Sequence, residues 1–422
     1  MSAQRWKGNG GLLRHPVLRT LLFSLFLLQI GIWIRNYAIL LFIMEKTGGD
    51  PVAVSLISLA QIVPIFVFSL IGGTYSDRWK AKKTIIICDL LSALSIFIVL
   101  IALLYGSWQA VFFTTFFSAI TAQFSQPASV KLMKIHANDE QVQTAMMVNQ
   151  MLLSVFAIIG PVLGTIVYQL FGIYFSVAIM CVAFLLSAGV LTMLPPDRMK
   201  LDIHQQATPI RKELLAGLRY VFSVKPLVIL NASIVVCGLA LGLIQPLGIF
   251  LVTERLSFPK ESIQWLSMAS GVGMVIGGAL MLLLRKKVSP PVLLLTGIAV
   301  AGGSISVAGY STHFGLTMTA QLFGYFVYPM IQAAISILVL KHTEEAFVGR
   351  VTGLRVSLLT GSTMVGVALA GWLKGMLSVV VLYQFAAVLF ALGFIIAFPL
   401  LSSGRKSLSE NKSSLQKLEG GY

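Results

Sequence analysis

Long apolar segments recur along the chain and are separated by short polar stretches. They are long enough for helices that cross a bilayer, since one crossing takes about 20 apolar residues. None alternates strictly between apolar and polar residues, as the strands of an outer-membrane barrel do. The pattern predicts an all-α membrane protein with twelve transmembrane helices. The expected helices lie at about residues 17–43, 53–73, 84–105, 109–130, 142–168, 172–194, 226–253, 263–284, 291–310, 315–340, 350–373 and 379–401.

The largest polar interruption, residues 195–225, divides six predicted helices from six. We therefore expect an N-terminal six-helix bundle over 1–194, a cytoplasmic middle loop over 195–225 and a C-terminal six-helix bundle over 226–401. The tail 402–422 is rich in Ser, Lys and Glu, and we expect it to be cytoplasmic and disordered. Short motifs recur in both halves at nearly constant spacing, which predicts two pseudo-repeats with a site between them.

The composition agrees with a chain that lives in lipid. Of the 422 residues, 57% are hydrophobic and 11% are charged, whereas soluble domains carry about 25% charged residues. The three cysteines lie within apolar segments, so we expect neither a disulfide framework nor a metal site.

The net charge of +16 would also suit a nucleic-acid-binding protein, but its distribution argues against one. Of the 31 Lys and Arg residues, 25 fall on the side of the predicted membrane that holds the N-terminus, and 4 fall on the other side. Cytoplasmic loops carry such an excess of cations. The charge therefore predicts a multi-pass protein of the cell (inner or plasma) membrane with both termini in the cytoplasm.

A basic segment, Gly73–Lys83, joins the second and third predicted helices with the spacing G-x3-D-R-x3-K-K. A positive-inside loop needs only the cations, not Asp77. The spacing resembles the signature of the major facilitator superfamily, with Lys80 where glycine is usual. The resemblance implies that fold, and it implies that Asp77 latches the cytoplasmic side near the start of helix 11, at Arg350. The matching positions are Gly73, Asp77, Arg78, Lys82 and Lys83.

A second motif lies in the fifth predicted helix, where Gly160, Pro161 and Gly164 resemble the core of the family's antiporter signature, with Thr165 in place of the final glycine. The resemblance favours export. The same residues also fit ordinary close packing of membrane helices. Further stretches, such as 47–51 and 349–351, look like the drug-exporter branch that contains macrolide efflux proteins and enterobactin exporters.

Three charged residues fall within predicted helices, where charge is costly and marks candidate functional sites. Asp89 in helix 3 and Arg355 in helix 11 lie at similar depth and could pair, either for coupling or as a structural ion pair. Arg35 in helix 1 could line the cavity, take part in coupling or be held by carbonyls. Many drug–proton antiporters of the family that this chain resembles carry acidic residues in helix 1, 4, 5 or 10. The corresponding predicted helices of this chain contain no acidic residue. Asp89 and Asp77 are therefore the leading candidates for carrying protons, with Glu254 third.

Neutral polar side chains in the predicted helices are candidates for lining a substrate cavity, although each could instead join neighbouring helices by hydrogen bonds. The candidates, with one aromatic residue, are Gln29, Trp33, Asn36, Gln61, Gln123, Gln126, Asn149, Gln245 and Gln332.

The chain has no phosphate-binding loop and no zinc-protease motif, so we expect neither an enzyme nor a cofactor. We predict a monomeric secondary active exporter of amphiphilic or cationic small molecules, such as drugs or macrolides, with protons as the candidate coupling ion. One alternative is a carrier of lipids, lysolipids or siderophores on the same scaffold. Another is a membrane sensor that transports nothing.

Overall fold

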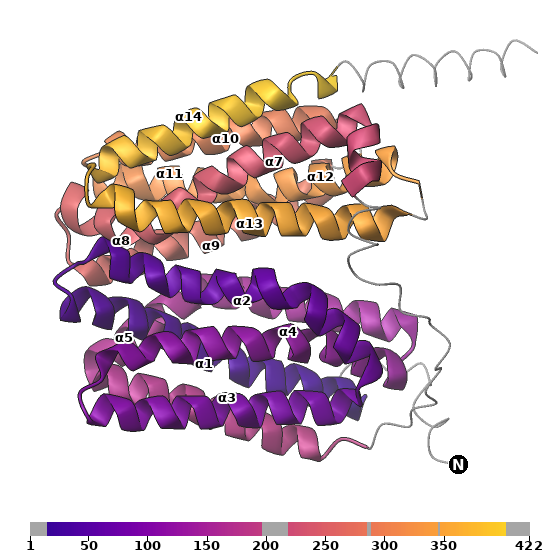
Figure 1. Cartoon of the computed structure of the whole chain (residues 1–422), viewed down its shortest axis with the longest axis vertical. Coiled ribbons are helices and arrows are strands. Elements are labelled where there is room, and N and C mark those ends of the chain that lie inside the picture. Colours follow the sequence, from indigo (N-terminus) through magenta and orange to yellow (C-terminus); the bar gives the residue numbers. More distant parts are fainter. Residues whose placement is uncertain (1–14, 196–217, 285–287, 345–346, 402–422) are drawn as a thin grey trace, which may run out of the picture. The chain divides into compact units, whose positions relative to one another are not determined.

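The computed structural model describes residues 15–195, 218–284, 288–344 and 347–401, without the side chains of 69–78 and 282–284. Every regular element in these residues is helical (Figure 1). The predicted tail 402–422 and most of the predicted middle loop 195–225 lie outside the described residues. The chain divides into two compact units, Met1–Gln205 with Phe258–Met268 and Gln206–Ser257 with Ala269–Tyr422. The bundle boundaries drawn from the sequence stay a prediction.

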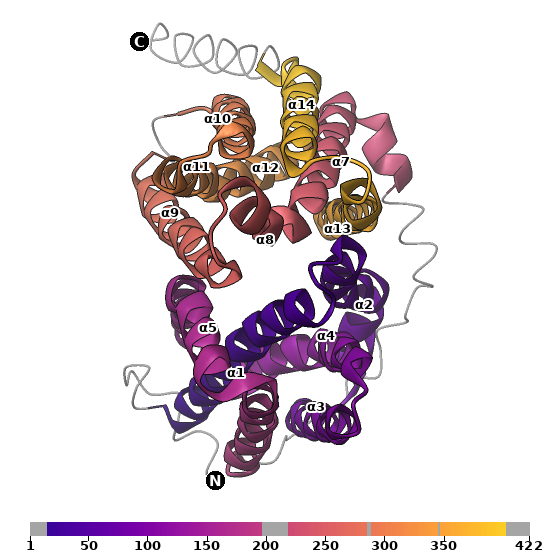
Figure 2. The ribbon, with the colours of Figure 1, turned by 90° about the vertical axis from the view of Figure 1, so that its left-hand side faces the viewer.

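The first unit is built from long helices that Figure 2 views roughly end-on. Helix α1 packs against α5, α2 packs against α4, and α3 packs against both α4 and α5. The bounds are α1 Pro16–Lys46, α2 Pro51–Arg78, α3 Ala81–Leu104, η3 Trp108–Ala110, α4 Val111–His136 and α5 Asp139–Thr192.

In the second unit, α7 packs against α13 and α14, and α10 packs against α11, α12 and α14. The bounds are α7 Lys225–Ile244, η4 Gln245–Leu247, α8 Gly248–Phe250, η5 Leu251–Arg255, α9 Ile263–Leu284, α10 Pro290–Tyr310, α11 Phe314–Phe326, α12 Tyr328–His342, α13 Val348–Lys374 and α14 Val379–Ala397. The short η6, Lys260–Ser262, precedes α9 and belongs to the segment assigned to the first unit.

Ten helical segments in the described residues are long and apolar enough to cross a membrane. One of them, α5, has 54 residues and breaks at Gly172, whose φ of 73° is left-handed and therefore favours glycine. The two arms of α5, 139–171 and 173–192, are the two helices predicted there. The more polar α4 is not among the ten, and with it the described segments account for the twelve predicted helices. The predicted all-α membrane fold is confirmed.

Helix α1 contacts both arms of α5. A Cβ added at Gly160 in the first arm would meet the Trp33 ring, and one added at Gly164 would lie 2.8 Å from the Trp33 carbonyl oxygen. On another face of α1, a Cβ at Gly31 would lie 2.5 Å from the Sδ of Met180 in the second arm. Glycine thus lets the backbones approach closely, as is usual in membrane bundles.

At one end of the unit, a buried apolar cluster joins Leu18 of α1, Ile85 of α3 and Leu132 of α4. The cluster aligns the first turns of α1 and α3. The Nζ of Lys82 donates to the carbonyl oxygens of Thr192, at 2.8 Å, and Leu194, where α5 ends. A cation bound to the last carbonyls stabilises a helix C-terminus, so Lys82 has a structural role that its signature position did not predict.

His15 precedes α1 at the same end and is 3% exposed. Its Nε2 donates to the carbonyl oxygen of His136 at the end of α4, over 3.0 Å. Burial lowers the pKa of His15 below its ordinary value, and this outweighs the opposite effect of the hydrogen bond to the carbonyl. The neutral imidazole is therefore the form that the fold favours.

We expect Gly160→Ala to lower the free energy of unfolding by about 1–3 kcal/mol, because the new Cβ would lie 2.5 Å from the Cγ of Trp33. Thermal unfolding of the purified protein in detergent measures the change. Gly189→Ala in the same helix is the matched control, since a Cβ there meets no atom within 4 Å. Equal melting temperatures for the two variants would contradict the packing of α1 on the first arm.

His15 predicts a loss of stability in acid. The pKa of His15 is lower in the folded state than its value of 6.5 in the unfolded state. The stability that neutral His15 contributes is therefore present above pH 6.5 and is lost as the pH falls below that value. The melting temperature should therefore drop between pH 7.5 and pH 5.5, and His15→Gln should show a smaller drop, because glutamine keeps a donor but takes no charge. A variant that loses as much as the parent would exclude His15 as the cause.

Candidate functional site

The first unit encloses a cavity of about 270 Å³ between its helices. It has room for several water molecules or for part of a ligand. Apolar walls from α1 and α2 alternate with hydroxyl, amide and charged groups. The polar lining residues are Ser24, Gln29, Arg35, Gln61, Asp89, Thr115, Ser118, Thr121, Gln123, Ser125, Gln126 and Ser129.

Asp89 in α3 is one of the two charged groups in this cavity and is 2% exposed. The Oγ of Ser187 donates to its Oδ2 over 2.5 Å, and the Oγ of Ser24 lies 2.7 Å from that of Ser187. Because Ser187 donates to Asp89, Ser24 is the donor in the second bond. This chain of hydroxyls connects a buried carboxyl in α3 to α1 through the second arm of α5.

Arg35 in α1 is the other charged group and is 5% exposed. Its Nε and Nη2 donate to the Oδ1 of Asn36 over 3.2 and 2.9 Å, and its Nη1 donates to the Oγ of Ser118 over 2.8 Å. Ser118 in turn donates to the carbonyl oxygen of Thr114, which orients the hydroxyl. No described carboxylate lies within ion-pair distance of Arg35.

The predicted lining residues are only partly gathered here. Gln29, Gln61, Gln123 and Gln126 line the cavity. Asn36 instead orients Arg35, and Trp33 packs on Gly160. Asn149 is partly buried and Gln245 is exposed, and neither lines this cavity or the cavity within the other unit.

The hydroxyl groups were not among the residues predicted from the sequence. Ser24, Ser187 and Ser118 hold the two charged groups, and the Oγ of Ser92 lies 2.7 Å from that of Thr121. Serine and threonine occur throughout membrane helices. No signal in the residue pattern singled these out.

A second cavity, of about 110 Å³, lies within the other unit. Gln332 donates from its Nε2 to the Oη of Tyr328 over 2.8 Å beside it. Arg355 lines this cavity but is only partly buried. The other polar lining residues are Ser233, Ser304, Gln321, Tyr325 and Tyr383. A pair between Asp89 and Arg355 would join the two units and stays a prediction.

The loop signature is described in part. Helix α2 runs through Gly73, Asp77 and Arg78, whose side chains lie outside those described. Lys80 and Lys83 are exposed. The latch of Asp77 with helix 11 therefore stays a prediction.

At the predicted partner of that latch, Arg350 is exposed in the first turn of α13. Its guanidinium lies 5.3 Å from the centre of the Phe347 ring, which stacks on Tyr220 with centroids 4.4 Å apart. Arg350 therefore has an aromatic partner within its own unit.

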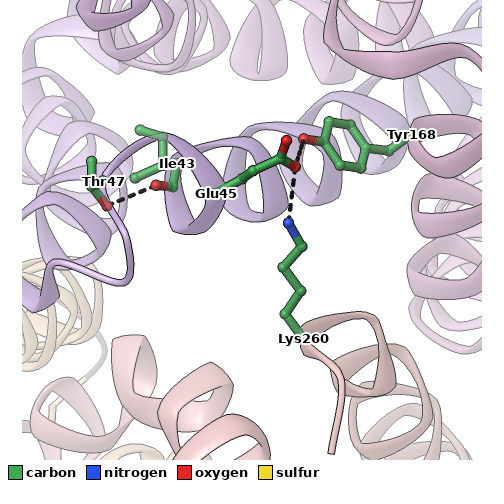
Figure 3. A network of polar contacts seen from close by, with 5 residues as sticks. All are labelled: Ile43, Glu45, Thr47, Tyr168 and Lys260. Carbon is green, nitrogen blue, oxygen red and sulfur yellow. Dashed lines mark hydrogen bonds and ion pairs between the residues drawn. The ribbon is translucent and has the colours of Figure 1, made fainter.

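The far end of α1 carries a polar network (Figure 3). The Oε2 of Glu45 accepts from the Oη of Tyr168 over 3.1 Å and pairs with the Nζ of Lys260 over 2.9 Å. Thr47 donates from its Oγ1 to the carbonyl oxygen of Ile43 over 2.7 Å and ends the helix. The network joins α1, the first arm of α5 and the Phe258–Met268 segment. Its exposed carboxylate makes its contribution to stability small, about 0–1 kcal/mol.

The family model of the Major Facilitator Superfamily matches residues 21–253, more than half of the chain. The chain belongs to the major facilitator superfamily. This confirms the resemblance that the Gly73–Lys83 spacing indicated. Family and fold are those of a multi-pass membrane transporter.

Bacterial transporters are similar over most of the chain. It is 26% identical to an uncharacterized MFS-type transporter, YkuC of Bacillus subtilis, over 79% of this chain and 80% of that one. It is 23% identical to macrolide efflux protein A of Streptococcus pyogenes over 80% and 84%. It is 25% identical to the enterobactin exporter EntS of Citrobacter koseri over 90% of each chain. The predicted resemblance to macrolide efflux proteins and enterobactin exporters is confirmed.

A solved structure shares the fold. The nucleoside transporter NupG superposes with a TM-score of 0.73 over 92% of this chain and 99% of that one, at 13% identity. At this identity the likeness bears on the fold alone.

We expect Ser187→Ala to lower the free energy of unfolding by about 1–3 kcal/mol, because it leaves the buried Asp89 without its donor. The same substitution in an Asp89→Ala background should cost clearly less, and thermal unfolding of the four proteins gives the coupling. Ser176→Ala is the matched control, because that buried hydroxyl bonds only within its own helix, to Gly172. Additive effects would exclude the hydrogen bond as the source of the cost.

Proposed function

We propose that this chain is a secondary active exporter of amphiphilic small molecules, cationic ones included, which works by alternating access in the cell membrane. Membership in the major facilitator superfamily supports transport, and the efflux proteins among its relatives support export. The observation that carries the proposal is the cavity of the first unit, where polar groups and two buried charges lie among apolar walls. Such a lining suits molecules with both a polar and an apolar part.

Protons are the proposed coupling ion, with Asp89 as their carrier. Among the described acids, Asp89 lines the cavity and is bound through Ser187 to Ser24. A carrier must change its charge between the two access states, and a buried carboxyl at the edge of a polar cavity suits that role. Asp77 is proposed to latch the cytoplasmic side.

A carrier of siderophores is a second candidate. The enterobactin exporter matches 90% of this chain and is itself covered to 90%, which supports a substrate of that kind on the same scaffold. Lipids and lysolipids are further candidate substrates under this alternative. We propose a monomer with both termini in the cytoplasm, in keeping with the cation asymmetry of the loops.

Expression in a bacterial host that lacks its own pumps should lower the accumulation of at least one amphiphilic dye or macrolide relative to an empty vector. Collapse of the pH gradient should stop this export, because Asp89 would no longer load and release protons in one direction. Asp89→Asn should export little, since the amide cannot exchange a proton. Fluorescence of the dye in intact cells measures both effects.

The matched control is Asp139→Asn, which removes an exposed carboxyl at the start of α5 and should export like the parent. Unchanged accumulation across a broad panel would reject drug efflux and favour the siderophore or lipid alternative. Export that persists in Asp89→Asn or without a pH gradient would reject proton coupling through this residue.

A further inference from the structure

The guanidinium of Arg35 is a buried positive charge with unused donors. An arginine side chain has five N–H groups, and the described bonds to Asn36 and Ser118 engage three of them. One N–H on each terminal nitrogen thus has no partner among the described residues. The side chain is 5% exposed and lines the cavity of the first unit. A charge buried in this way calls for a compensating negative charge.

Asp89 lines the same cavity but does not supply that charge. It accepts its hydrogen bond from Ser187, which also binds Ser24. Ser24 and Arg35 are separated along α1 by about 16 Å, at 1.5 Å per residue. The bonds to Asn36 and Ser118 hold the guanidinium close to the position of Arg35 along α1, and therefore away from Ser24. The cavity therefore has a carboxyl toward one end and an uncompensated guanidinium toward the other.

The lining of the cavity that holds Arg35 suits an amphiphile. Gln29, Gln61 and Ser118 offer polar contacts, whereas Ile32 and Ile65 are apolar parts of the same wall. Guanidinium is planar and pairs with a carboxylate through two parallel hydrogen bonds. Arg355 in the other cavity is only partly buried, so its charge is less dependent on a partner.

We propose that Arg35 binds the carboxylate of an amphiphilic organic acid, with the apolar part of the ligand along the α1 and α2 wall. This assigns a substrate class to the cavity and rests on the proposed function. The two N–H groups that Asn36 and Ser118 leave without a partner donate to the two carboxylate oxygens. A neutral ester or an ammonium analogue of the same length leaves Arg35 without its partner.

Binding to the purified protein in lipid nanodiscs tests this without transport. The probes are dansyl-labelled undecanoate, its methyl ester and the matching undecyl ammonium compound, followed by dansyl fluorescence. The carboxylate should bind about tenfold or more tightly than the ester and the ammonium compound, as expected for hydrogen bonds to a charged group. Arg35→Gln should reduce this preference to about twofold or less, and Arg35→Lys should keep part of it.

Arg19→Gln is the matched control, because it removes one cation from the exposed face of the same helix and should keep the full preference. Equal affinity of carboxylate and ester for the parent protein, or no binding of the carboxylate, would overturn the proposal. So would a carboxylate preference that survives in Arg35→Gln. Should Arg35→Gln not fold, the parent protein and Arg35→Lys decide the matter through the same comparison.

The export assay separates this inference from the proposed function. Export of amphiphiles by a protein with no carboxylate preference would leave the function standing and reject the role of Arg35. Carboxylate binding at Arg35 in a protein that exports nothing would support the role of Arg35 and reject the proposed function.

Discussion

The packing of α1 against the two arms of α5 is the interaction on which the candidate site depends. Trp33 lies on Gly160 in the first arm, and Ser24 bonds to Ser187 in the second. Successive helical residues turn by about 100°, so Arg35 points about 200° away from Trp33. The contact between the indole and the first arm therefore directs the guanidinium away from that arm and toward α4, where Ser118 accepts a hydrogen bond from it.

The two buried charges of the cavity are accommodated by different means. Asp89, in the third turn of α3, accepts a hydrogen bond from the hydroxyl of Ser187. Arg35 lies farther along α1, and its neighbours Asn36 and Ser118 can only accept part of its hydrogen bonds. Satisfying a carboxylate takes a donor, which a serine supplies. A carboxyl can also become neutral by taking up a proton, whereas a guanidinium keeps its charge, and this difference makes Arg35 the more open position for a ligand.

The helices were predictable from the sequence because hydrophobic length alone decides whether a segment can span lipid. The glutamines of α1, α2 and α4 were predictable as lining residues, because amides in an apolar helix need polar partners. The hydroxyls of Ser24, Ser187 and Ser118 were not, since serine can bond to its own helix and needs no partner elsewhere. Their roles follow from which helices meet, which depends on the break at Gly172 and on residues far apart in the chain.

The departures from the family signatures fall where the backbone does not require glycine. Lys80 is exposed and extended, with a φ of −70° that any residue adopts. Thr165 is fully buried, yet it is the neighbouring Gly164 whose added Cβ would press on the Trp33 carbonyl and on Tyr37. The antiporter motif has thus kept glycine at the two positions that contact α1 and has lost it where a side chain fits. The altered signature therefore retains the two glycines that let α1 pack closely and so place Arg35. Threonine at position 165 is compatible with a working transporter.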